Sequence, residues 1–228
     1  ALALSTCARP QPPERPAQEP EVRVALSVGA ERVVVGGQGS VAAVTAGTPA
    51  FMIEQDQPVT VVSDGRALVV DRGSEAARYE SLTFVSLTPG RFVTLAGKPF
   101  RGVMEAFVRN GRLTAVNRVP VEDYLLGVVT AEMGRRIGQE LAAVRAQAVV
   151  SRTYALRNRG RFSGEGYDLR ATVADQAYGG VEAESLEGTA AVRGTVGEVL
   201  TYGGQLITAL FHSTCGYRTA TPGEVFRS

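Results

Sequence analysis

The chain has 228 residues but no tryptophan, a single histidine and two cysteines. One histidine excludes the His-Glu-x-x-His pattern of zinc proteases, and it leaves His212 as the one base that a Ser–His–Asp triad could use. No serine near it has a supportive context. Cys7 and Cys215 lie far apart, which excludes a disulfide framework and leaves at most one bridge. No apolar run is long enough to span a bilayer.

Charge of one sign is also lacking, because 24 basic residues face 23 acidic ones and the net charge is +1. This balance argues against a nucleic-acid partner. The glycine-rich stretch Val33–Gly39 has no helix after it, so it does not indicate a dinucleotide site. A hydrophobic fraction of 44% supports a real core and excludes global disorder.

The N-terminal stretch indicates export. Residues Ala1–Cys7 are apolar and end in small residues, as at the end of a secretory signal. The last four also resemble a bacterial lipobox, which predicts a cell-envelope lipoprotein held to the membrane through a lipid on Cys7. Thr6 departs from the usual Gly or Ala, so plain secretion is the alternative. Residues 8–21 hold five prolines and predict an extended linker.

Residues 22–118 predict a β-rich N-terminal part, because short apolar or alternating stretches are separated by turn signals. The expected strands are Val22–Leu26, Glu31–Val35, Val41–Val44, Val59–Val62, Ala67–Val70, Arg91–Leu95, Gly102–Val108 and Arg112–Val116. Asn110-Gly111 predicts a tight hairpin, since both central residues of such a turn need positive φ.

Residues 119–228 predict a catalytic core segment that begins with two helices. The first runs from Pro120 to a stop at Gly134, and the second from about Gln139 to Arg157. The second helix has one apolar face, and its opposite side is expected to carry Arg145, Arg152 and Arg157. A hairpin is expected from Thr195–Tyr202 and Gln205–Phe211, joined by Gly203-Gly204. The ending at Ser228 predicts that part of the domain is missing.

These elements together predict an α+β fold, in which a β-rich part supports a two-helix segment, β-hairpins and a groove for an extended glycan. Glu132 is the candidate for chemistry, because it ends the apolar first helix beside Met133 and before a glycine. Apolar surroundings favour the protonated form of a carboxyl group, which a general acid needs. A solvated glutamate at a helix end is the alternative interpretation.

His212 lies in a polar run with Ser213 and Cys215. It could orient a substrate, or it could bind zinc with Cys215, although a zinc site needs three or four protein ligands. A Cys215–His212 nucleophilic pair in a hydrolase and a purely structural histidine are further alternatives.

Seven blocks of this sequence resemble, in order and spacing, the SpoIID/LytB family of peptidoglycan-acting domains. The resemblance runs from about Val22 and is dense from Val119. The blocks are Val119–Val129, Ala131–Met133, Ala143–Val149, Ser151–Ala155, Tyr167–Leu169, Asp175–Gly180 and Phe211–Gly216.

The resemblance implies a lytic transglycosylase that cuts between N-acetylmuramic acid and N-acetylglucosamine in glycan stripped of its stem peptides, alongside a cell-wall amidase. The glutamate of the family's Glu-Met pair is catalytic, and here it is Glu132. Family members occur both in spore formers and elsewhere. Some bind zinc through one His and two Cys; this chain offers His212 and Cys215 without a further downstream Cys, so no cofactor is expected.

The chemistry agrees with one catalytic carboxylate. A hydrolysing glycosidase needs two, whereas in a lytic transglycosylase the substrate's own hydroxyl attacks. Asp168 or Asp175 could supply a second, but the sequence does not place either beside Glu132. The residues expected to bind the glycan are Gln147, Arg152, Tyr154, Gln176, His212 and Ser213. A non-catalytic amidase enhancer, or glycan-binding module, is the main alternative function.

Overall fold

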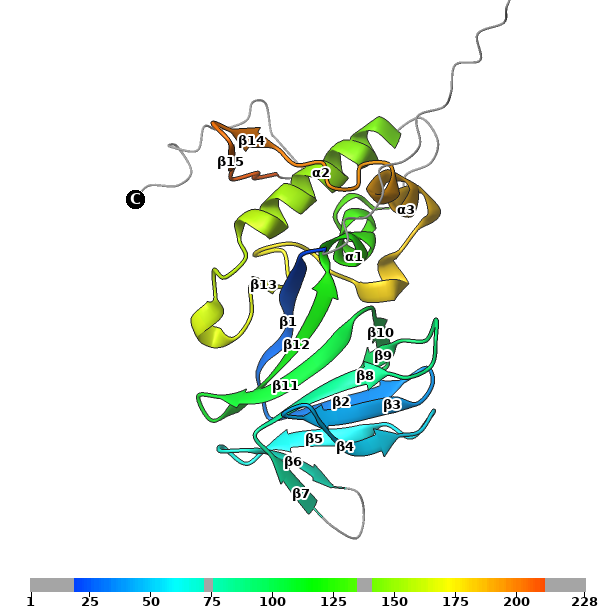
Figure 1. Ribbon diagram of the computed structural model, residues 1–228, viewed down its shortest axis with the longest axis vertical. Helices are drawn as coiled ribbons and strands as arrows, with labels where there is room; N and C mark the ends of the chain where they lie inside the picture. The colour runs from blue at the N-terminus through cyan, green and yellow to red at the C-terminus, as the bar shows by residue number, and fades with distance from the viewer. Residues whose placement is uncertain (1–18, 72–75, 135–140, 212–228) are drawn as a thin grey trace, which may run out of the picture.

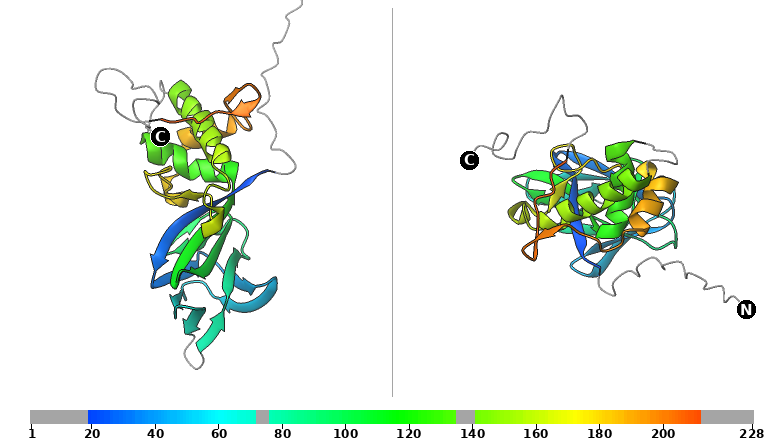
Figure 2. Two further views of the ribbon diagram at one scale, coloured as in Figure 1. Left: turned by 90° about the vertical axis from the view of Figure 1, so that its left-hand side faces the viewer. Right: turned by 90° about the horizontal axis from the view of Figure 1, so that it is seen from above.

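The computed structural model describes residues 19–71, 76–134 and 141–211 (Figure 1). Most of the strands lie at one end of the molecule, and the three α-helices lie at the other end together with one short hairpin (Figure 1). The left view of Figure 2 shows the same division from the side. The strands are β1 (Glu21–Ala30), β2 (Arg32–Gly37), β3 (Val41–Thr45), β4 (Thr48–Ile53), β5 (Val59–Ser63), β6 (Leu68–Asp71), β7 (Ala76–Tyr79), β8 (Ser81–Ser86), β9 (Val93–Leu95), β10 (Lys98–Phe100), β11 (Val103–Arg109), β12 (Arg112–Pro120), β13 (Leu169–Arg170), β14 (Thr201–Tyr202) and β15 (Gln205–Leu206).

Two larger sheets share one hydrophobic core. Seven strands form a sheet in the order β13-β1-β12-β11-β8-β3-β4, and six form another in the order β10-β9-β2-β5-β6-β7. Val24 and Phe84 of the first sheet and Val35 and Val70 of the second are all fully buried in the same cluster. The alternation of strand residues therefore places one face of each sheet against the other.

The hairpin between β11 and β12 has the predicted turn. Asn110 and Gly111 have φ values of 52° and 76°, as a two-residue turn of this kind requires. Along β11, Met104 and Ala106 point into the core, whereas Glu105 lies between them on the outer face. This alternation confirms the strand that the sequence predicts.

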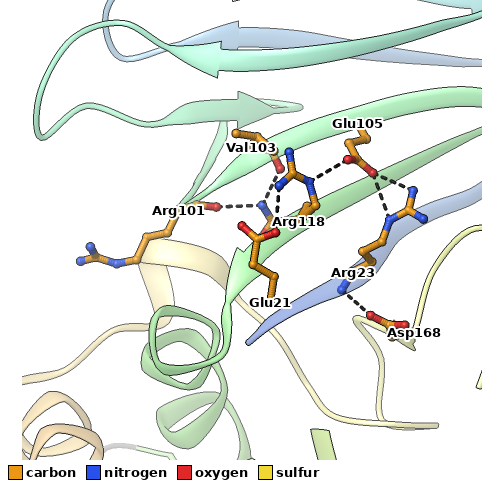
Figure 3. Close-up of polar contacts among 8 residues, drawn as sticks. Glu21, Arg23, Arg101, Val103, Glu105, Arg118 and Asp168 are labelled. Atoms are coloured by element: carbon orange, nitrogen blue, oxygen red, sulfur yellow. Dashed lines mark hydrogen bonds and ion pairs between the residues drawn. The ribbon is translucent and has the colours of Figure 1, made fainter. Parts of the chain in front are cut away.

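A ladder of charged side chains crosses the outer face of β1, β12 and β11 (Figure 3). Glu105 accepts hydrogen bonds from Arg23 Nη2 at 2.7 Å and from Arg118 Nε at 2.9 Å. Arg118 Nη1 reaches Glu21 at 2.8 Å. The backbone N–H of Arg23 donates to Asp168 Oδ2, also at 2.8 Å, which ties β1 to the segment before β13. Such half-exposed pairs add little stability but favour one register of the strands.

Three helices pack together beyond the end of the seven-stranded sheet (Figure 1). They are α1 (Val121–Met133), α2 (Leu141–Arg157) and α3 (Leu186–Arg193), with short 3-10 turns η2 (Ser163–Glu165) and η3 (Gly180–Ala183). Helix α1 continues directly from β12 and contacts both other helices. In the part of the chain that the structure describes, no helix is long and apolar enough to cross a membrane.

Asn117 of β12 joins the strands to the helical end. Its side chain is 1% exposed and donates to the carbonyl oxygens of Arg101 and Val103 at 2.8 and 3.0 Å. Its Oδ1 accepts the hydroxyl of Tyr178 at 2.8 Å. Arg101 adds a second connection through two bonds, of 2.6 and 2.8 Å, to Glu184 after η3.

The α+β class, the β-rich first half and the two predicted helices are confirmed. The sequence did not indicate α3 or the strands β4, β7, β8, β10 and β13. The hairpin joined by Gly203-Gly204 is confirmed, but its expected length is wrong, because β14 and β15 have two residues each. Gly197, with φ of 73°, breaks the extended chain before β14. The expected solvent side of α2 also needs correction, since Arg152 is 1% exposed.

Candidate functional site

Glu132 lies at the last turn of α1, with its side chain partly exposed. Gly134, at a φ of 69°, ends the helix, and its N–H donates to the carbonyl of Thr130. Oε1 of Glu132 accepts the backbone N–H of Ala177 at 2.5 Å. The carboxyl group is therefore held at one oxygen by a loop 45 residues further along the chain.

The loop segment Asp175–Ala177 is tied to both long helices. The hydroxyl of Tyr154 on α2 donates to Asp175 Oδ1 at 3.0 Å. Gln176 is fully buried; its Oε1 accepts the hydroxyl of Tyr124 on α1 at 3.2 Å, and its Nε2 donates to the carbonyl of Ser151 on α2 at 3.4 Å. Each residue of the segment thus makes a bond that fixes it to a helix.

Two buried tyrosines lie under this segment. Burial raises the pKa of Tyr124 well above its ordinary value, and the neighbouring Tyr178, Asp175 and Glu132 raise it further. Burial also raises the pKa of Tyr178. Both hydroxyls therefore stay protonated at neutral pH and act as hydrogen-bond donors, with the two rings 4.8 Å apart.

Gly127 allows the loop to lie directly on α1. A Cβ atom at this position would come within 2.7 Å of both the Gly180 carbonyl oxygen and Tyr178 Cε2. The Gly127 carbonyl accepts the N–H of Gly179 at 3.1 Å. A glycine in mid-helix lowers helix propensity, and here it permits the close approach of a second backbone.

Arg152, predicted to bind substrate, lies in the interior. Its Nε and Nη2 each donate to the carboxylate of Glu122 at 2.7 Å, and Nη1 donates to the Glu198 carbonyl at 3.0 Å. The Gly197 N–H also donates to Glu122, at 3.2 Å. This arrangement joins α1, α2 and the chain after α3. The donors of Arg152 are bonded within the protein, so its role in this structure is to hold these elements together.

The other predicted substrate-binding residues are placed differently from one another. Gln147 is half-buried and donates to Ser151 Oγ at 3.0 Å, while Tyr154 and Gln176 are buried around the loop segment. Tyr154 and Gln176 thus bond within or to the loop segment that contacts Glu132, whereas the hydrogen bond of Gln147 stays within α2. His212 and Ser213 lie outside the described residues.

Arg161 and Arg170 place positive charge on the surface beside the loop segment. Their guanidinium carbons lie 5.0 and 4.6 Å from the ring centre of Phe162. Arg161 Nη1 donates to Asp175 Oδ1 at 2.9 Å, although its side chain remains 48% exposed. Asp175 connects both arginines to the loop segment, because it accepts the Arg161 side chain and the Arg170 backbone N–H. Both arginine side chains remain exposed beside the segment.

The two aspartates considered as a second carboxylate both hold the loop together. Asp168 accepts backbone N–H groups of Arg23 and Gly160 at 2.8 and 2.7 Å. Asp175 accepts Tyr154, Arg161 and, at 2.9 Å, the backbone N–H of Arg170. These bonds give each aspartate a role in loop structure.

Among residues 19–71, 76–134 and 141–211, no group of three or more His, Cys, Asp or Glu side chains could hold a metal ion. His212 and Cys215 lie outside these ranges, so the predictions about zinc and a cysteine nucleophile stay predictions. Two depressions, of about 410 and 350 Å³, lie elsewhere; the first includes Arg32 and Arg112, and the second Arg101 and Asp123. Neither is lined by Glu132.

Sequence comparison bears directly on the region around Glu132. Residues 109–202 match the SpoIID family, described as stage II sporulation protein. These residues belong to the SpoIID family. The match contains α1, α2, α3 and the segment Asp175–Ala177, so the SpoIID region includes the whole arrangement around Glu132. The SpoIID family is linked to the processing of cell-wall glycan.

Two relatives match parts of the chain. An uncharacterised protein of Brachyspira hyodysenteriae is 33% identical over 137 residues, which cover 58% of this chain and 36% of that protein. The amidase enhancer of Bacillus subtilis is 38% identical over 104 residues, which cover 46% of this chain and 14% of the enhancer. The matched part is thus well under half of either relative. No solved structure gives a significant match.

Several residues of the site carried no separate signal in the sequence. Tyr124, Gly127 and Ala177 lie inside blocks of the resemblance, but nothing in their type indicates chemistry. The donor at Ala177 is a backbone N–H, which every residue except proline carries, so the residue type does not indicate it. The one signal that could have indicated a close approach of two backbones is a glycine in mid-helix, Gly127, together with the Gly179-Gly180 pair, and no prediction from the sequence used it.

Proposed function

We propose that the SpoIID region is a peptidoglycan lytic transglycosylase in which Glu132 is the catalytic acid and base. The observation that carries the proposal is the Glu132 carboxyl group, partly exposed at a helix end and held at Oε1 by Ala177. A carboxyl group fixed at one oxygen and accessible to solvent is suited to proton transfer.

The reaction needs one carboxyl group. Glu132 donates its proton to the glycosidic oxygen that leaves with N-acetylglucosamine, and the bond from this oxygen to C1 of N-acetylmuramic acid breaks. The C6 hydroxyl of the same muramic acid attacks C1, forms the 1,6-anhydro bond and transfers its proton to Glu132. Glu132 is regenerated and no water is consumed, so a second carboxylate to activate water is not required.

The engagement of Asp168 and Asp175 in loop structure supports this one-carboxylate mechanism over hydrolysis. The exposed guanidinium groups of Arg161 and Arg170 support a substrate that carries negative charge. A glycan strand stripped of stem peptides exposes one lactyl carboxylate for each muramic acid, and we propose it as the substrate.

The proposal is tested by incubating the purified protein with peptide-stripped peptidoglycan and identifying the fragments by mass spectrometry. Anhydromuramic ends are expected from the wild type and from Glu80→Gln, an exposed glutamate among the strands. Glu132→Gln is expected to keep its fold and lose cleavage. Reducing ends would establish a hydrolase instead, and an active, folded Glu132→Gln would remove Glu132 from the mechanism.

A second candidate function is a non-catalytic amidase enhancer, favoured by the match to the B. subtilis protein of that name. In that role the chain would bind the wall or an amidase and would tolerate Glu132→Gln. Purified protein would release no glycan fragments without amidase, yet would raise the rate of stem-peptide release when an amidase is added. Insensitivity of glycan cleavage to thiol-blocking reagents would set aside a Cys215–His212 hydrolase.

We also propose that the protein works outside the cytoplasmic membrane, with a lipid on Cys7 or as a secreted protein. The N-terminal residues Ala1–Cys7 and the proline-rich stretch after them support this location. Labelling cells with a radioactive fatty acid tests the lipid, because a Cys7→Ser protein would lose the label and an unlipidated protein would never acquire it.

A further inference from the structure

The side chain of Gln176 is buried and bonded to two helices. It is 0% exposed, so its amide group does not face the solvent where a glycan would lie. Its two hydrogen bonds go to different helices, to the hydroxyl of Tyr124 on α1 and to the backbone carbonyl of Ser151 on α2. The side chain therefore bridges the two helices from the inside of the loop.

The bridge fixes the neighbouring backbone. The N–H of Ala177 is the next donor along the chain, and it bonds to Glu132 Oε1 at 2.5 Å. On the other side of Gln176, Asp175 is anchored by Tyr154 and Arg161. Asp175 is anchored, and both Oε1 and Nε2 of Gln176 are bonded. The Gln176 amide group therefore sets the direction in which the next N–H, that of Ala177, points.

This direction has a chemical consequence for Glu132. A protonated carboxyl group has one hydroxyl oxygen and one carbonyl oxygen, and a backbone N–H needs an acceptor lone pair. Since Ala177 bonds to Oε1, the transferable proton belongs on Oε2. Rotation of the carboxyl group would break this bond, so the loop selects both its orientation and the oxygen that carries the proton.

We infer that Gln176 is a positioning residue, which aims the carboxyl group of Glu132 through the N–H of Ala177 and does not touch the glycan. The inference rests on the proposed transglycosylase function for its kinetic consequence. It assigns Gln176 a role different from the substrate contact that the sequence suggests.

The kinetic test compares Gln176→Met with the wild type on peptide-stripped glycan. Because a misplacement of about 1 Å can cost about 100-fold in rate, kcat should fall by about 10- to 100-fold. KM should stay within about twofold, because Gln176 does not contact the glycan and the substitution removes no binding contact to the substrate. Thr195→Val is the matched control, because it loses a buried hydrogen bond at the end of α3 without touching the loop segment, and its kcat should not change.

A readout without catalysis follows the amide proton of Ala177 by NMR. In Gln176→Met its resonance should move toward the position that it takes in Glu132→Ala, and in Thr195→Val it should not move. If Gln176→Met does not fold, Tyr124→Phe removes one of the two bonds to Gln176 and should shift the resonance in the same direction.

Each outcome has a distinct meaning. A raised KM with unchanged kcat would make Gln176 a substrate contact, and an unmoved Ala177 resonance would also overturn the inference. A wild-type protein that releases no anhydromuramic fragments would defeat the proposed function alone, because the NMR comparison would still decide whether Gln176 positions the Ala177 N–H.

Discussion

Arg152 and Glu122 face each other in the interior between α2 and α1, where two hydrogen bonds of 2.7 Å join side chains that are 1% and 3% exposed. Removal of one partner leaves a buried charge without compensation, which costs about 3–5 kcal/mol. Arg152→Met should therefore lower the free energy of unfolding by that amount in urea titrations. Arg157→Gln, an exposed arginine of the same helix, should change it by less than about 0.5 kcal/mol. A small loss in Arg152→Met would show that the pair does not hold the helices.

Gly127→Ala tests the close approach of the loop to α1. The added Cβ would meet Gly180 and Tyr178 at 2.7 Å, so the loop must move, at a cost of about 1–3 kcal/mol that exceeds the helix-propensity gain of about 1 kcal/mol. Glycan cleavage should fall by more than the stability change explains, because Ala177 moves with the loop. The control is Gly164→Ala, where a Cβ would meet no heavy atom within 4 Å. Full cleavage activity in Gly127→Ala would contradict the link between loop position and Glu132.

The two buried tyrosines predict a loss of stability in alkali. Burial raises the pKa of Tyr124 and Tyr178 above the value near 10 of an unfolded chain. Above this pH the unfolded chain releases protons that the folded chain retains, so the free energy of unfolding falls as pH rises. The slope reaches about 1.4 kcal/mol per pH unit for each tyrosine, and the stabilisation is fully present below about pH 10.

Urea titrations between pH 9 and 11.5 measure this slope. Tyr178→Phe should reduce it, while Tyr202→Phe, whose ring is 86% exposed, should leave it unchanged. Equal slopes in the wild type and Tyr178→Phe would mean that Tyr178 ionises in the folded protein.

Arg161→Gln tests the charge beside the site. Arg161 is bonded to Asp175 but half-exposed, so it can also bond to a carboxylate of the substrate. The variant should raise KM for peptide-stripped strands by about 3- to 10-fold, equivalent to about 0.7–1.4 kcal/mol, with the difference shrinking as salt screens the charge. Strands whose lactyl carboxylates are capped as amides should be cut equally by both proteins. Arg157→Gln is the control, and a similar KM rise there would point to general charge instead of a specific contact.

Much of the fold was predictable because local signals and burial agree. Asn110-Gly111 defined its hairpin, and α1 lies between Pro120 and Gly134 as the helix signals indicate. The missed helix α3 is only eight residues long, and its N-cap Ser185 precedes a weakly apolar stretch. The overestimated hairpin shows the opposite error. The chain before Gly203-Gly204 alternates like a strand, but in the described structure the pairing ends at Leu200, whose carbonyl accepts the N–H of Ile207, and residues 195–199 belong to no strand.

The candidate site was only partly predictable. Glu132 could be singled out by its helix end and by the resemblance, but its partner is a backbone N–H, which no residue type encodes. Arg152 illustrates the same limit from the other side. Its spacing on α2 relative to Arg145 and Arg157 predicts an exposed side chain. Arg152 is buried only because α1 packs against this side of α2 and supplies Glu122 as its partner.

The order of strands in the larger sheet determines the order in which they can pair during folding. Strand β1 is made early, yet its neighbours are β12 and β13, so its pairing Glu21↔Pro120 spans about a hundred residues of chain. Contacts so distant in sequence form late and slow the folding of the domain, whereas hairpins such as β11–β12 close locally. The sheet therefore cannot be completed from its first strand outward, and β1 must wait, unpaired, until the chain that leads into α1 has followed it.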